Sequence, residues 1–373
     1  MNHRLRQLVA GYDAKAPLDR ASTIPADWYF DEQLAERERQ AVFGASWQVV
    51  GRVDQVRNPG DFVTTEIAGE PIVAVRGDDG ILRSFFNVCR HHAAAVATEP
   101  TGNARLLRCP YHGWTYGLDG TLKGTPDFAG VCDFDPRKNG LTPARVEIWE
   151  QFVCVNLDPA ACSLADFTGE LAARVAPLSI GKLRFVERRS YELRCNWKVF
   201  VDNYLDGGYH VPYVHKGLNS VLDYRQYTVE NGARFCVQSS PMHPPEAGEA
   251  DAATTYTRSG DRAYYFWLYP NFMLNWYAGV MDTNLVLPLG TDRTLVIFDF
   301  YFGDAFDDER ARQSVAVSDR IQDEDVAICE AVQRGLRSRA YRAGRLSVRR
   351  EAGEHLFHRL LAADLQRSLG AGA

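Results

Sequence analysis

The sequence predicts an α+β fold, in which a small antiparallel β domain precedes a larger domain whose antiparallel sheet is covered by helices. Three observations lead to this fold class. Short strand-like runs separated by turn signals occupy residues 47–157. Longer strand-like runs follow a helical stretch after residue 157. The chain then closes with a long helical pattern from about residue 307 to residue 339.

The expected domain limits follow from these changes in pattern. Residues 1–44 are mostly polar and partly helical, and we expect them to form a lead-in segment that packs on the larger domain. We expect the small β domain over residues 45–158 and the larger domain over residues 159–373. With 373 residues and 46% hydrophobic content, the chain is long enough to bury the cores of two domains.

Individual elements can be assigned in chain order. In the first domain, PIVAV and ILRSFFNV are strand-like runs separated by RGDDG, and YGLDGTL contains an Asp-Gly pair that favours a tight hairpin. In the second domain, SLADFTGELAARVAPL predicts a helix. Three later runs predict strands, namely RFVERRSYELRCNW, AYYFWLYPNFMLNWY and RTLVIFDFYF.

Composition argues against several classes of protein. No window approaches the roughly 18 uninterrupted apolar residues of a membrane span, and the N-terminus lacks the apolar core of a secretory signal. We therefore expect a cytoplasmic protein with no membrane partner. Eight cysteines scattered along a large chain favour reduced thiols or metal ligands over a disulfide framework. The net charge of -6 comes from interleaved acids and bases, which favours a small-molecule substrate and a protein partner over nucleic acid.

Two short loops of the first domain carry the residues of a metal site. Cys89 and His91 belong to the first loop, and Cys109 and His112 follow in the second. Thiolates suit iron in an iron-sulfur cluster, and replacing two thiolates by imidazoles on one iron raises its reduction potential. Each loop supplies one sulfur and one nitrogen, so the two loops can hold a 2Fe-2S cluster from both sides. The cysteines would bind one iron and the histidines the other.

Structural zinc is the competing interpretation, because two cysteines and two histidines also satisfy that metal. A zinc finger places its two cysteines together and its two histidines on a helix. Here the ligand types alternate within each loop, and the loops lie among strands. The spacing therefore favours an iron-sulfur cluster. His92 stands beside the first loop, where we expect it to face away from the metal.

The same loops resemble a known family. CRHHAA and CPYHGWTYGLDG are similar to the Rieske domain, and the similarity covers roughly a third of the chain. Respiratory Rieske proteins carry an additional cysteine in each loop, and these two form a disulfide. Both additional cysteines are missing here, as they are in the oxygenase branch of the family.

A second group of candidate ligands lies in NWKVFVDNYLDGGYHVPYVH, where His210 and His215 are five residues apart. Neutral imidazoles are good ligands for ferrous iron. On a regular helix these positions differ by about 140°, so the rings converge only where the segment departs from regularity. Gly207, Gly208 and Pro212 favour such a departure. The alternative is that the two histidines belong to a half-buried surface.

A third ligand can come from the closing helix. Its apolar residues at helical spacing are Val317, Ile321, Ile328, Val332 and Leu336. Asp325 falls about 30° from the centre of this stripe, Glu324 lies at its margin and Asp323 on the opposite face. A buried carboxylate needs a cation beside it. Iron bound by two histidines and one carboxylate would be that cation, and an arginine is the alternative.

The whole chain resembles the ring-hydroxylating oxygenase large-subunit family, and most closely its choline monooxygenase-like members. The resemblance rests on NWKVFVDNYLDGGYHVPYVH, LYPNF, EDVAICEAVQRGL and AYRAGR, together with the two Rieske loops. It implies that a mononuclear Fe(II) is held by His210, His215 and Asp325.

The family also uses an acid to link the cluster of one subunit to the iron of the next. Many relatives place it three residues before the first histidine, where this chain has Gly207. The candidate catalytic residues are therefore Asp206, Asp202 and Asn203.

The resemblance further implies an activity and its partners. The chain would use dioxygen and electrons from a flavin or iron-sulfur reductase, or from a ferredoxin, that draws on NAD(P)H. It would hydroxylate or oxidatively N-demethylate a small quaternary ammonium or N-methylated compound. A head-to-tail homotrimer is expected. Aromatic faces attract such cations, and Tyr265, Trp267, Trp276 and Tyr277 are the candidate pocket residues, with ordinary core packing as the alternative.

Three other functions stay open on the sequence alone. The chain could be the alpha subunit of an aromatic-ring-hydroxylating dioxygenase, which would need a small β partner subunit and an apolar pocket. It could be a Rieske electron-transfer protein without oxygenase activity, which would bind two irons per chain instead of three. A zinc-stabilised binding module would be colourless.

Overall fold

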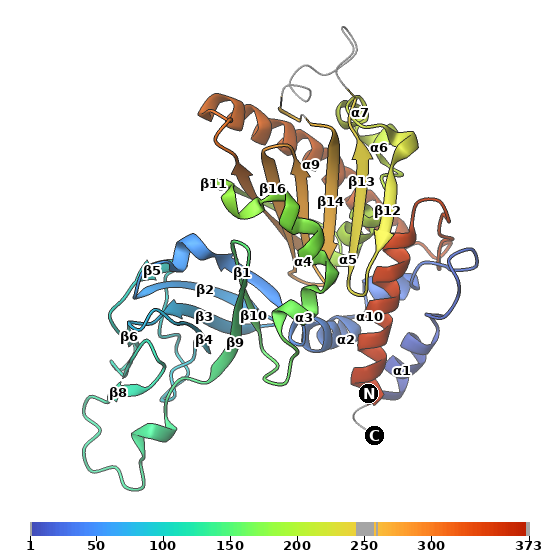
Figure 1. Ribbon diagram of the computed structural model, residues 1–373. Helices are drawn as coiled ribbons and strands as arrows, with labels where there is room; N and C mark the ends of the chain where they lie inside the picture. Colours follow the sequence, from blue (N-terminus) through green and yellow to red (C-terminus); the bar gives the residue numbers. More distant parts are fainter. Residues whose placement is uncertain (1, 244–256, 259, 371–373) are drawn as a thin grey trace. The chain divides into compact units, whose positions relative to one another are not determined.

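A computed structural model of the chain describes residues 2–243, 257–258 and 260–370 (Figure 1). The chain folds into two compact units, one made of residues 39–167 and the other of residues 1–38 together with residues 168–373. The divisions therefore fall after residues 38 and 167, where the sequence suggested residues 44 and 158. The expected outer limits, residues 1 and 373, lie outside the described residues.

The unit of residues 39–167 contains a seven-stranded antiparallel sheet in the order β1-β10-β9-β4-β3-β2-β5 and a three-stranded sheet in the order β6-β7-β8. The strands of the larger sheet are β1 (Gln48–Arg52), β2 (Asp61–Ile67), β3 (Glu70–Arg76), β4 (Leu82–Phe86), β5 (Thr101–Asn103), β9 (Pro143–Trp149) and β10 (Phe152–Asn156). Those of the smaller sheet are β6 (Leu107–Arg108), β7 (Thr115–Tyr116) and β8 (Leu122–Gly124). The hairpin expected from YGLDGTL is confirmed, because β7 pairs with β8 and Gly120 takes a φ of 80° in the turn.

The other unit is built on one seven-stranded antiparallel sheet, in the order β11-β17-β16-β15-β14-β13-β12. Its strands are β11 (Arg184–Leu193), β12 (Thr228–Asn231), β13 (Phe235–Pro241), β14 (Arg262–Leu268), β15 (Phe272–Tyr277), β16 (Val280–Pro288) and β17 (Thr294–Phe302). The run AYYFWLYPNFMLNWY thus forms two strands of one hairpin. With both sheets antiparallel and helices in the second unit, the expected α+β class is confirmed.

The helices are α1 (Asn2–Ala10), α2 (Glu32–Glu38), α3 (Leu164–Thr168), α4 (Glu170–Val175), α5 (Trp197–Leu205), α6 (Val211–Val214), α7 (Lys216–Asn219), α9 (Asp308–Leu336) and α10 (Ala352–Gly370). α5 contacts both α9 and β16, and α10 contacts α5 and β12. The single helix expected over residues 163–178 is interrupted at Gly169, whose φ of 52° and ψ of −130° lie outside the helical region. Within the described residues, no helix is both long and apolar enough to cross a membrane.

α5 is fixed at its first turn by a buried ion pair. The Nζ of Lys198 lies 2.8 Å from Oε1 of Glu38, the last residue of α2, and both side chains are almost completely buried. The indole N–H of Trp197 donates to the other oxygen of Glu38 over 2.9 Å. The side chain of Asn196 caps the helix by accepting from the backbone N–H of Lys198. The strand expected to reach residue 197 therefore ends at Leu193, and the chain turns directly into α5.

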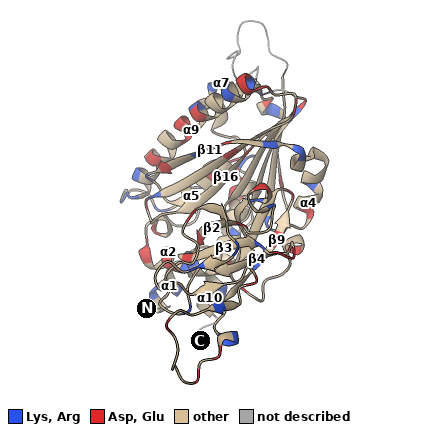
Figure 2. Ribbon diagram, turned by 90° about the vertical axis from the view of Figure 1, so that its left-hand side faces the viewer, with Lys and Arg blue, Asp and Glu red and all other residues tan. Residues whose placement is uncertain are grey.

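The long helix α9 does not pack through the apolar stripe that the sequence suggested. Ile328 and Val332 are 36% and 43% exposed. The buried residues of α9 are mostly small or polar: Ala311, Ser314, Val315, Val317, Ser318, Gln322, Cys329, Gln333 and Leu336. Asp325 lies in the same row, three residues after Gln322 and four before Cys329, and charged residues occupy the outer face (Figure 2). Asp325 itself is half-buried, with its side chain 14% exposed, and the stripe used to place it is partly exposed.

Candidate metal centres and active-site cavity

Two loops of the β unit share one pattern of backbone hydrogen bonds. The N–H of each cysteine donates to the carbonyl five residues later, over 2.9 Å from Cys89 and 2.8 Å from Cys109. The residue four places after each cysteine donates back to the cysteine carbonyl. That residue has a positive φ in both loops, 63° at Ala93 and 72° at Gly113. The two loops therefore turn the chain in the same way.

The structure brings the predicted cluster ligands together. Cys89 and Cys109 are each 2% exposed and belong to one hydrophobic cluster. The ring centroids of His91 and His112 are 4.7 Å apart. Nδ1 of His91 is buried and has no hydrogen-bond partner among the described residues. Burial and then the imidazoles of His92 and His112 lower the pKa of His91, which favours the neutral form that binds a metal.

Two aromatic residues support this site. The indole of Trp114 stacks on the ring of His91 at 4.7 Å with an interplanar angle of 2°. The hydroxyl of Tyr116 accepts from the backbone N–H of Arg90 and lies 3.3 Å from Sγ of Cys89. Hydrogen bonds to cluster sulfurs are one of the means by which proteins set a reduction potential. The exposed ring of His92 lies 4.2 Å from that of His91, so it does not turn away as expected.

The second group of ligands follows the end of α5. Gly207 and Gly208 each have a φ of 68°, a conformation that residues with a side chain rarely adopt. A Cβ added at Gly207 would lie 2.1 Å from the carbonyl oxygen of Arg350. The chain then forms the short helix α6 between His210 and His215. This is the departure from helical regularity that the spacing required.

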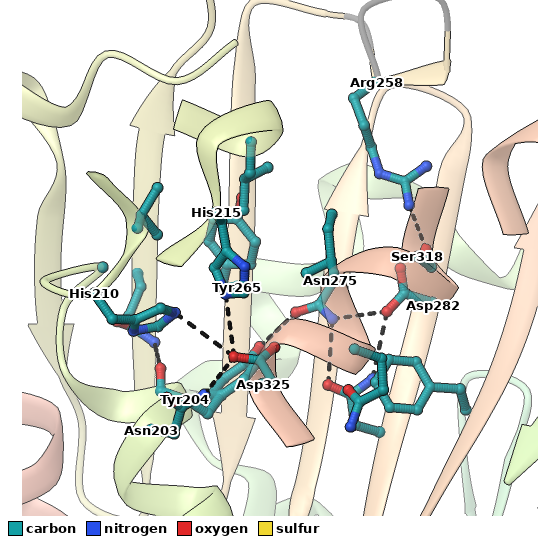
Figure 3. A pocket seen from close by; sticks show the side chains of 18 of the residues that line it. Asn203, Tyr204, His210, His215, Arg258, Tyr265, Asn275, Asp282, Ser318 and Asp325 are labelled. Carbon is teal, nitrogen blue, oxygen red and sulfur yellow. Dashed lines mark hydrogen bonds and ion pairs between the residues drawn. The ribbon is translucent and has the colours of Figure 1, made fainter. Parts of the chain in front are cut away.

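The three predicted ligands meet at one point. Ligand atoms of His210, His215 and Asp325 all lie within 4.8 Å of one another. Nε2 of His215 is 3.1 Å from Oδ1 of Asp325, and Nε2 of His210 is 4.0 Å from the same oxygen. The side-chain amide of Asn203 donates to Oδ1 of Asp325 over 2.8 Å, which fixes the carboxylate (Figure 3).

Carboxylates bind the outer nitrogen of both imidazoles. Nδ1 of His210 is 2.6 Å from Oδ2 of Asp206, and Nδ1 of His215 is 2.6 Å from Oε2 of Glu324. Burial alone would lower the pKa of His215, but its contacts with Asp325 and Glu324 outweigh this effect and raise the pKa. The pocket between the two Nε2 atoms and Asp325 therefore favours a positive charge. A divalent metal can supply it while Nδ1 keeps its proton.

A cavity of about 780 Å³, counting the solvent at its mouth, opens beside these three residues. One cross-strand row forms part of its wall, running from Gln238 through Tyr265 and Asn275 to Asp282. Tyr204 of α5 donates to Oδ1 of Asn275 over 2.8 Å. In Figure 3 His210 lies on the left of the view, His215 and Asp325 nearer its middle, and Arg258 and Asp282 on the right, with Asn275 between Asp325 and Asp282.

Four tyrosines line the cavity: Tyr204, Tyr227, Tyr265 and Tyr277. Burial raises the pKa of all four, so the phenols stay neutral. Of the four candidate pocket residues, Tyr265 and Tyr277 therefore line this cavity. The other two require correction. Trp276 points to the opposite face of β15 from Asn275 and Tyr277, where it packs on Tyr264. Trp267 shares a face with Tyr265 but is fully buried against Phe357 of α10.

Asp202 has a different environment from the other candidate catalytic residues. It accepts from the hydroxyl of Tyr29 over 2.6 Å and lies 2.9 Å from Nε2 of His358. It does not line the cavity, whereas Asn203 does. Asp202 thus connects α5 to α10 and to the N-terminal segment, away from the imidazoles of His210 and His215.

Comparison with known proteins identifies both units. Residues 46–135 match the Rieske [2Fe-2S] domain, and residues 180–367 match the ring hydroxylating alpha subunit (catalytic domain). The chain is 41% identical to the chloroplastic choline monooxygenase of Arabidopsis thaliana, over 97% of this chain and 87% of that protein. It belongs to the Rieske ring-hydroxylating oxygenase family.

Further relatives agree with this assignment. The chain is 35% identical to the carnitine monooxygenase oxygenase subunit of Escherichia coli K12, over 92% of this chain and 93% of that protein. A solved quaternary ammonium Rieske monooxygenase superposes with a TM-score of 0.84 at 30% identity, covering 93% of this chain and 96% of that chain.

The protein is therefore a Rieske non-haem iron oxygenase that uses a 2Fe-2S cluster and a mononuclear iron. The described residues fit both groups. In the Rieske domain, two buried thiols belong to one cluster, and the rings of two imidazoles lie 4.7 Å apart, one of them with a buried nitrogen that has no partner among the described residues. In the catalytic domain, two imidazoles and a carboxylate converge, and each imidazole already has a carboxylate on its far nitrogen.

Several supporting residues were not found from the sequence. Glu324 was placed at the margin of the helix and Trp114 was not singled out, although each contacts a predicted ligand. Asp282 and Arg258 also face the cavity without having been predicted. A buried acid on a strand between apolar residues, as in VMDTNLV, is the one signal that could have drawn attention to Asp282.

Proposed function

We propose that this oxygenase is a monooxygenase acting on a small quaternary ammonium or N-methylated compound. The observation that carries the proposal is the cavity beside the candidate iron ligands, which is lined by four neutral tyrosines and by the buried side chain of Asp282. Aromatic faces and an anion together are what binds a methylated ammonium group. The named relatives support the same class, since they are choline and carnitine monooxygenases. A flat apolar ring, the substrate of an aromatic-ring dioxygenase, would bring no positive charge to the tyrosine rings or to Asp282.

The proposed ligand assignment is as follows. Cys89, His91, Cys109 and His112 would hold the 2Fe-2S cluster, and His210, His215 and Asp325 the mononuclear iron. When bound, the mononuclear iron supplies oxygen activation with electrons from a cluster. Asn203 holds the carboxylate of Asp325, while Glu324 and Asp206 hold the two imidazoles through Nδ1. The tyrosines bind the cationic end of the substrate and exclude water around it.

In the proposed reaction, one oxygen atom enters the substrate and the other leaves as water, with two electrons and two protons consumed. Hydroxylation next to nitrogen gives either a stable alcohol or loss of an N-methyl group. The electrons would come from NAD(P)H through a reductase or ferredoxin. A homotrimer would place the cluster of one subunit beside the iron of the next, and the solved relative is described in terms of inter-subunit electron transfer.

Asp206 is the proposed connection between the two metal centres. Its carboxylate binds His210 through Nδ1 and is 14% exposed, so one side remains accessible to another chain. Asp202 is occupied by Tyr29 and His358. Asp206→Asn should keep both metals and slow the reoxidation of the cluster by oxygen and substrate. Wild-type kinetics would assign the connection to another residue.

The ligand assignment can be tested by counting iron. Asp325→Ala should lower the content from three irons to two per chain, keep the visible absorption of the cluster and abolish substrate-dependent oxygen uptake with a surrogate reductase. Asp323→Ala, on the exposed side of α9, is the matched control. Retained turnover in the Asp325 variant would contradict the assignment.

The substrate class can be tested separately. A panel of quaternary amines and aromatic acids should give coupled oxygen uptake only with the amines. Uptake coupled to an aromatic acid, with none for any amine, would favour the dioxygenase alternative.

A further inference from the structure

A second group of side chains suited to a metal joins α5 to α10. Ligand atoms of Asp202 on α5 and of Glu354 and His358 on α10 all lie within 4.8 Å of one another. Nε2 of His358 is 2.9 Å from Oδ1 of Asp202 and 3.9 Å from Oε1 of Glu354. The candidate iron ligands show almost the same spacing, with 3.1 Å and 4.0 Å between one carboxylate oxygen and two imidazole nitrogens. The second group therefore has the geometry of a metal site.

The carboxyl group of Glu354 is buried without a hydrogen bond. The residue is 6% exposed, and among the described residues no group donates to its side-chain oxygens. The nitrogen that faces it, Nε2 of His358, has one hydrogen to give and lies within hydrogen-bonding distance of Asp202 instead. A buried carboxylate with neither a donor nor a cation is costly. Glu354 thus faces the group with its bonding capacity unused.

The surroundings of Glu354 are negatively charged. Burial raises its pKa well above the ordinary value, and the carboxylates of Asp202, Glu351 and Asp206 raise it further. No arginine or lysine forms an ion pair with Asp202 or Glu354 in the part of the chain that the structure describes. The ammonium group of Lys198 interacts with Asp202 only through its charge, because it is bound in the buried ion pair with α2. A divalent ion would balance the two carboxylates of the group.

The other two side chains are held in positions that suit a ligand. The hydroxyl of Tyr29 donates to Oδ2 of Asp202 over 2.6 Å, while Oδ1 faces His358. Nδ1 of His358 is buried and has no partner among the described residues, so no contact there opposes moving the ring proton from Nε2 to Nδ1. Nε2 can then bind a metal. The side chains of Asp202 and Glu354 are 17% and 8% exposed, so an ion can reach the carboxylates.

We propose that Asp202, Glu354 and His358 bind a divalent first-row cation, manganese or zinc, at a structural site separate from both iron centres. Carboxylates suit manganese, and an imidazole together with carboxylates also suits zinc. Bonds of about 2.0–2.2 Å to one ion place its ligand atoms roughly 3–4 Å apart, so side-chain shifts of about 1 Å complete the site. The ion ties α5 to α10 and, through the hydrogen bond of Tyr29 to Asp202, to the N-terminal segment.

Manganese binding to the iron-loaded oxygenase tests the proposal. The protein is titrated with Mn²⁺ while its cluster is oxidised, and room-temperature electron paramagnetic resonance counts the free ion. Bound Mn²⁺, together with any zinc or manganese found beforehand by elemental analysis, should total one ion per chain, with three irons retained. An absence of such an ion would overturn the proposal and leave Glu354 as a neutral acid. Displacement of iron without a further bound ion would overturn it as well.

Variants then assign the ligands. Glu354→Gln keeps the size of the side chain and removes its charge. It should weaken Mn²⁺ binding by more than about 100-fold, because the loss of a ligand costs more than the roughly 10- to 100-fold loss for a residue that only orients one. Glu351→Gln is the matched control, since Glu351 adds negative charge near Glu354 but lies outside the ligand group, and it should lose at most about three-fold. Equal losses in the two variants would overturn the ligand assignment.

Two further measurements separate metal binding from the stability of a variant. Mn²⁺ should raise the melting temperature of the wild-type protein and leave that of Glu354→Gln unchanged. An equal rise in both would place the ion elsewhere and overturn the proposal. In crystals of the wild-type protein soaked with Mn²⁺, anomalous scattering at the manganese edge should give a peak between Asp202, Glu354 and His358. A manganese peak only at other positions would overturn the proposal even if Glu354→Gln failed to fold.

Discussion

Glu324 should be required for tight iron binding although it is not one of the candidate ligands. It lies next to Asp325 on α9 and accepts a hydrogen bond from Nδ1 of His215 over 2.6 Å. That bond fixes the ring so that Nε2 faces Asp325, and it increases the electron density on the imidazole. Glu324→Gln keeps the size of the side chain and removes its charge.

The expected size of the effect follows from the two side chains. Removing a carboxylate that orients a metal-binding imidazole generally lowers metal affinity by about 10- to 100-fold. The imidazole of His215 is 2% exposed, but the side chain of Glu324 is 45% exposed, so water can replace part of the lost interaction. We therefore expect a loss near the lower limit, about ten-fold or about 1.4 kcal/mol in the free energy of Fe(II) binding.

Competition with a chelator of known affinity measures this loss on protein whose cluster is intact. Asp323→Asn is the matched control, because it removes one charge from the adjacent, exposed position of α9. If both variants lost the same affinity, the effect would come from net charge and not from the contact with His215. Unchanged affinity in Glu324→Gln would refute the reasoning.

Two further predictions concern stability. Burial raises the pKa of Asp282, so the folded chain retains this proton to higher pH than the unfolded chain. The stability that the group contributes therefore falls as pH rises from the ordinary carboxyl range through the raised pKa. Thermal melts of ligand-free Asp282→Asn should lose this pH-dependent component, and a pH profile identical to that of the wild type would contradict the prediction. Trp267→Ala should lower the free energy of unfolding by about 3–5 kcal/mol in urea titrations, because the side chain is completely buried, whereas the partly exposed Trp276 should lose less on the same change. Equal losses would contradict the placement of these two indoles.

The sequence was sufficient to propose the candidate ligands and insufficient to predict their surroundings. The loop positions of Cys89 and Cys109 and the five-residue spacing of His210 and His215 reflect the chemistry directly, because each metal requires particular atoms at short range. Asp325 was proposed for a partly mistaken reason. Ser318, Gln322 and Asp325 line the cavity from the inner face of α9, so the centre of the apolar stripe lies to one side of the face that lines the cavity.

The cavity could not be predicted for a different reason. Alternation along a strand says which face a residue occupies, but not how far along the sheet the cavity extends. It separates Trp276 from Tyr277 correctly, yet it gives Tyr265 and Trp267 the same face. Only the packing of α10 against Trp267 removes that side chain from the cavity. Likewise, the contact of Glu324 with His215 joins segments that are distant in sequence, so the pattern along α9 cannot reveal it.

The two glycines before His210 restrict how this enzyme can be redesigned. If the acid of other family members were placed at position 207, three residues before that histidine, its β-carbon would lie 2.1 Å from the carbonyl oxygen of Arg350. The graft would need a reshaped segment before α10 as well as the new carboxyl group. Crowding by the backbone of Arg350 therefore restricts position 207 to glycine, and chimaeras should exchange the two segments together.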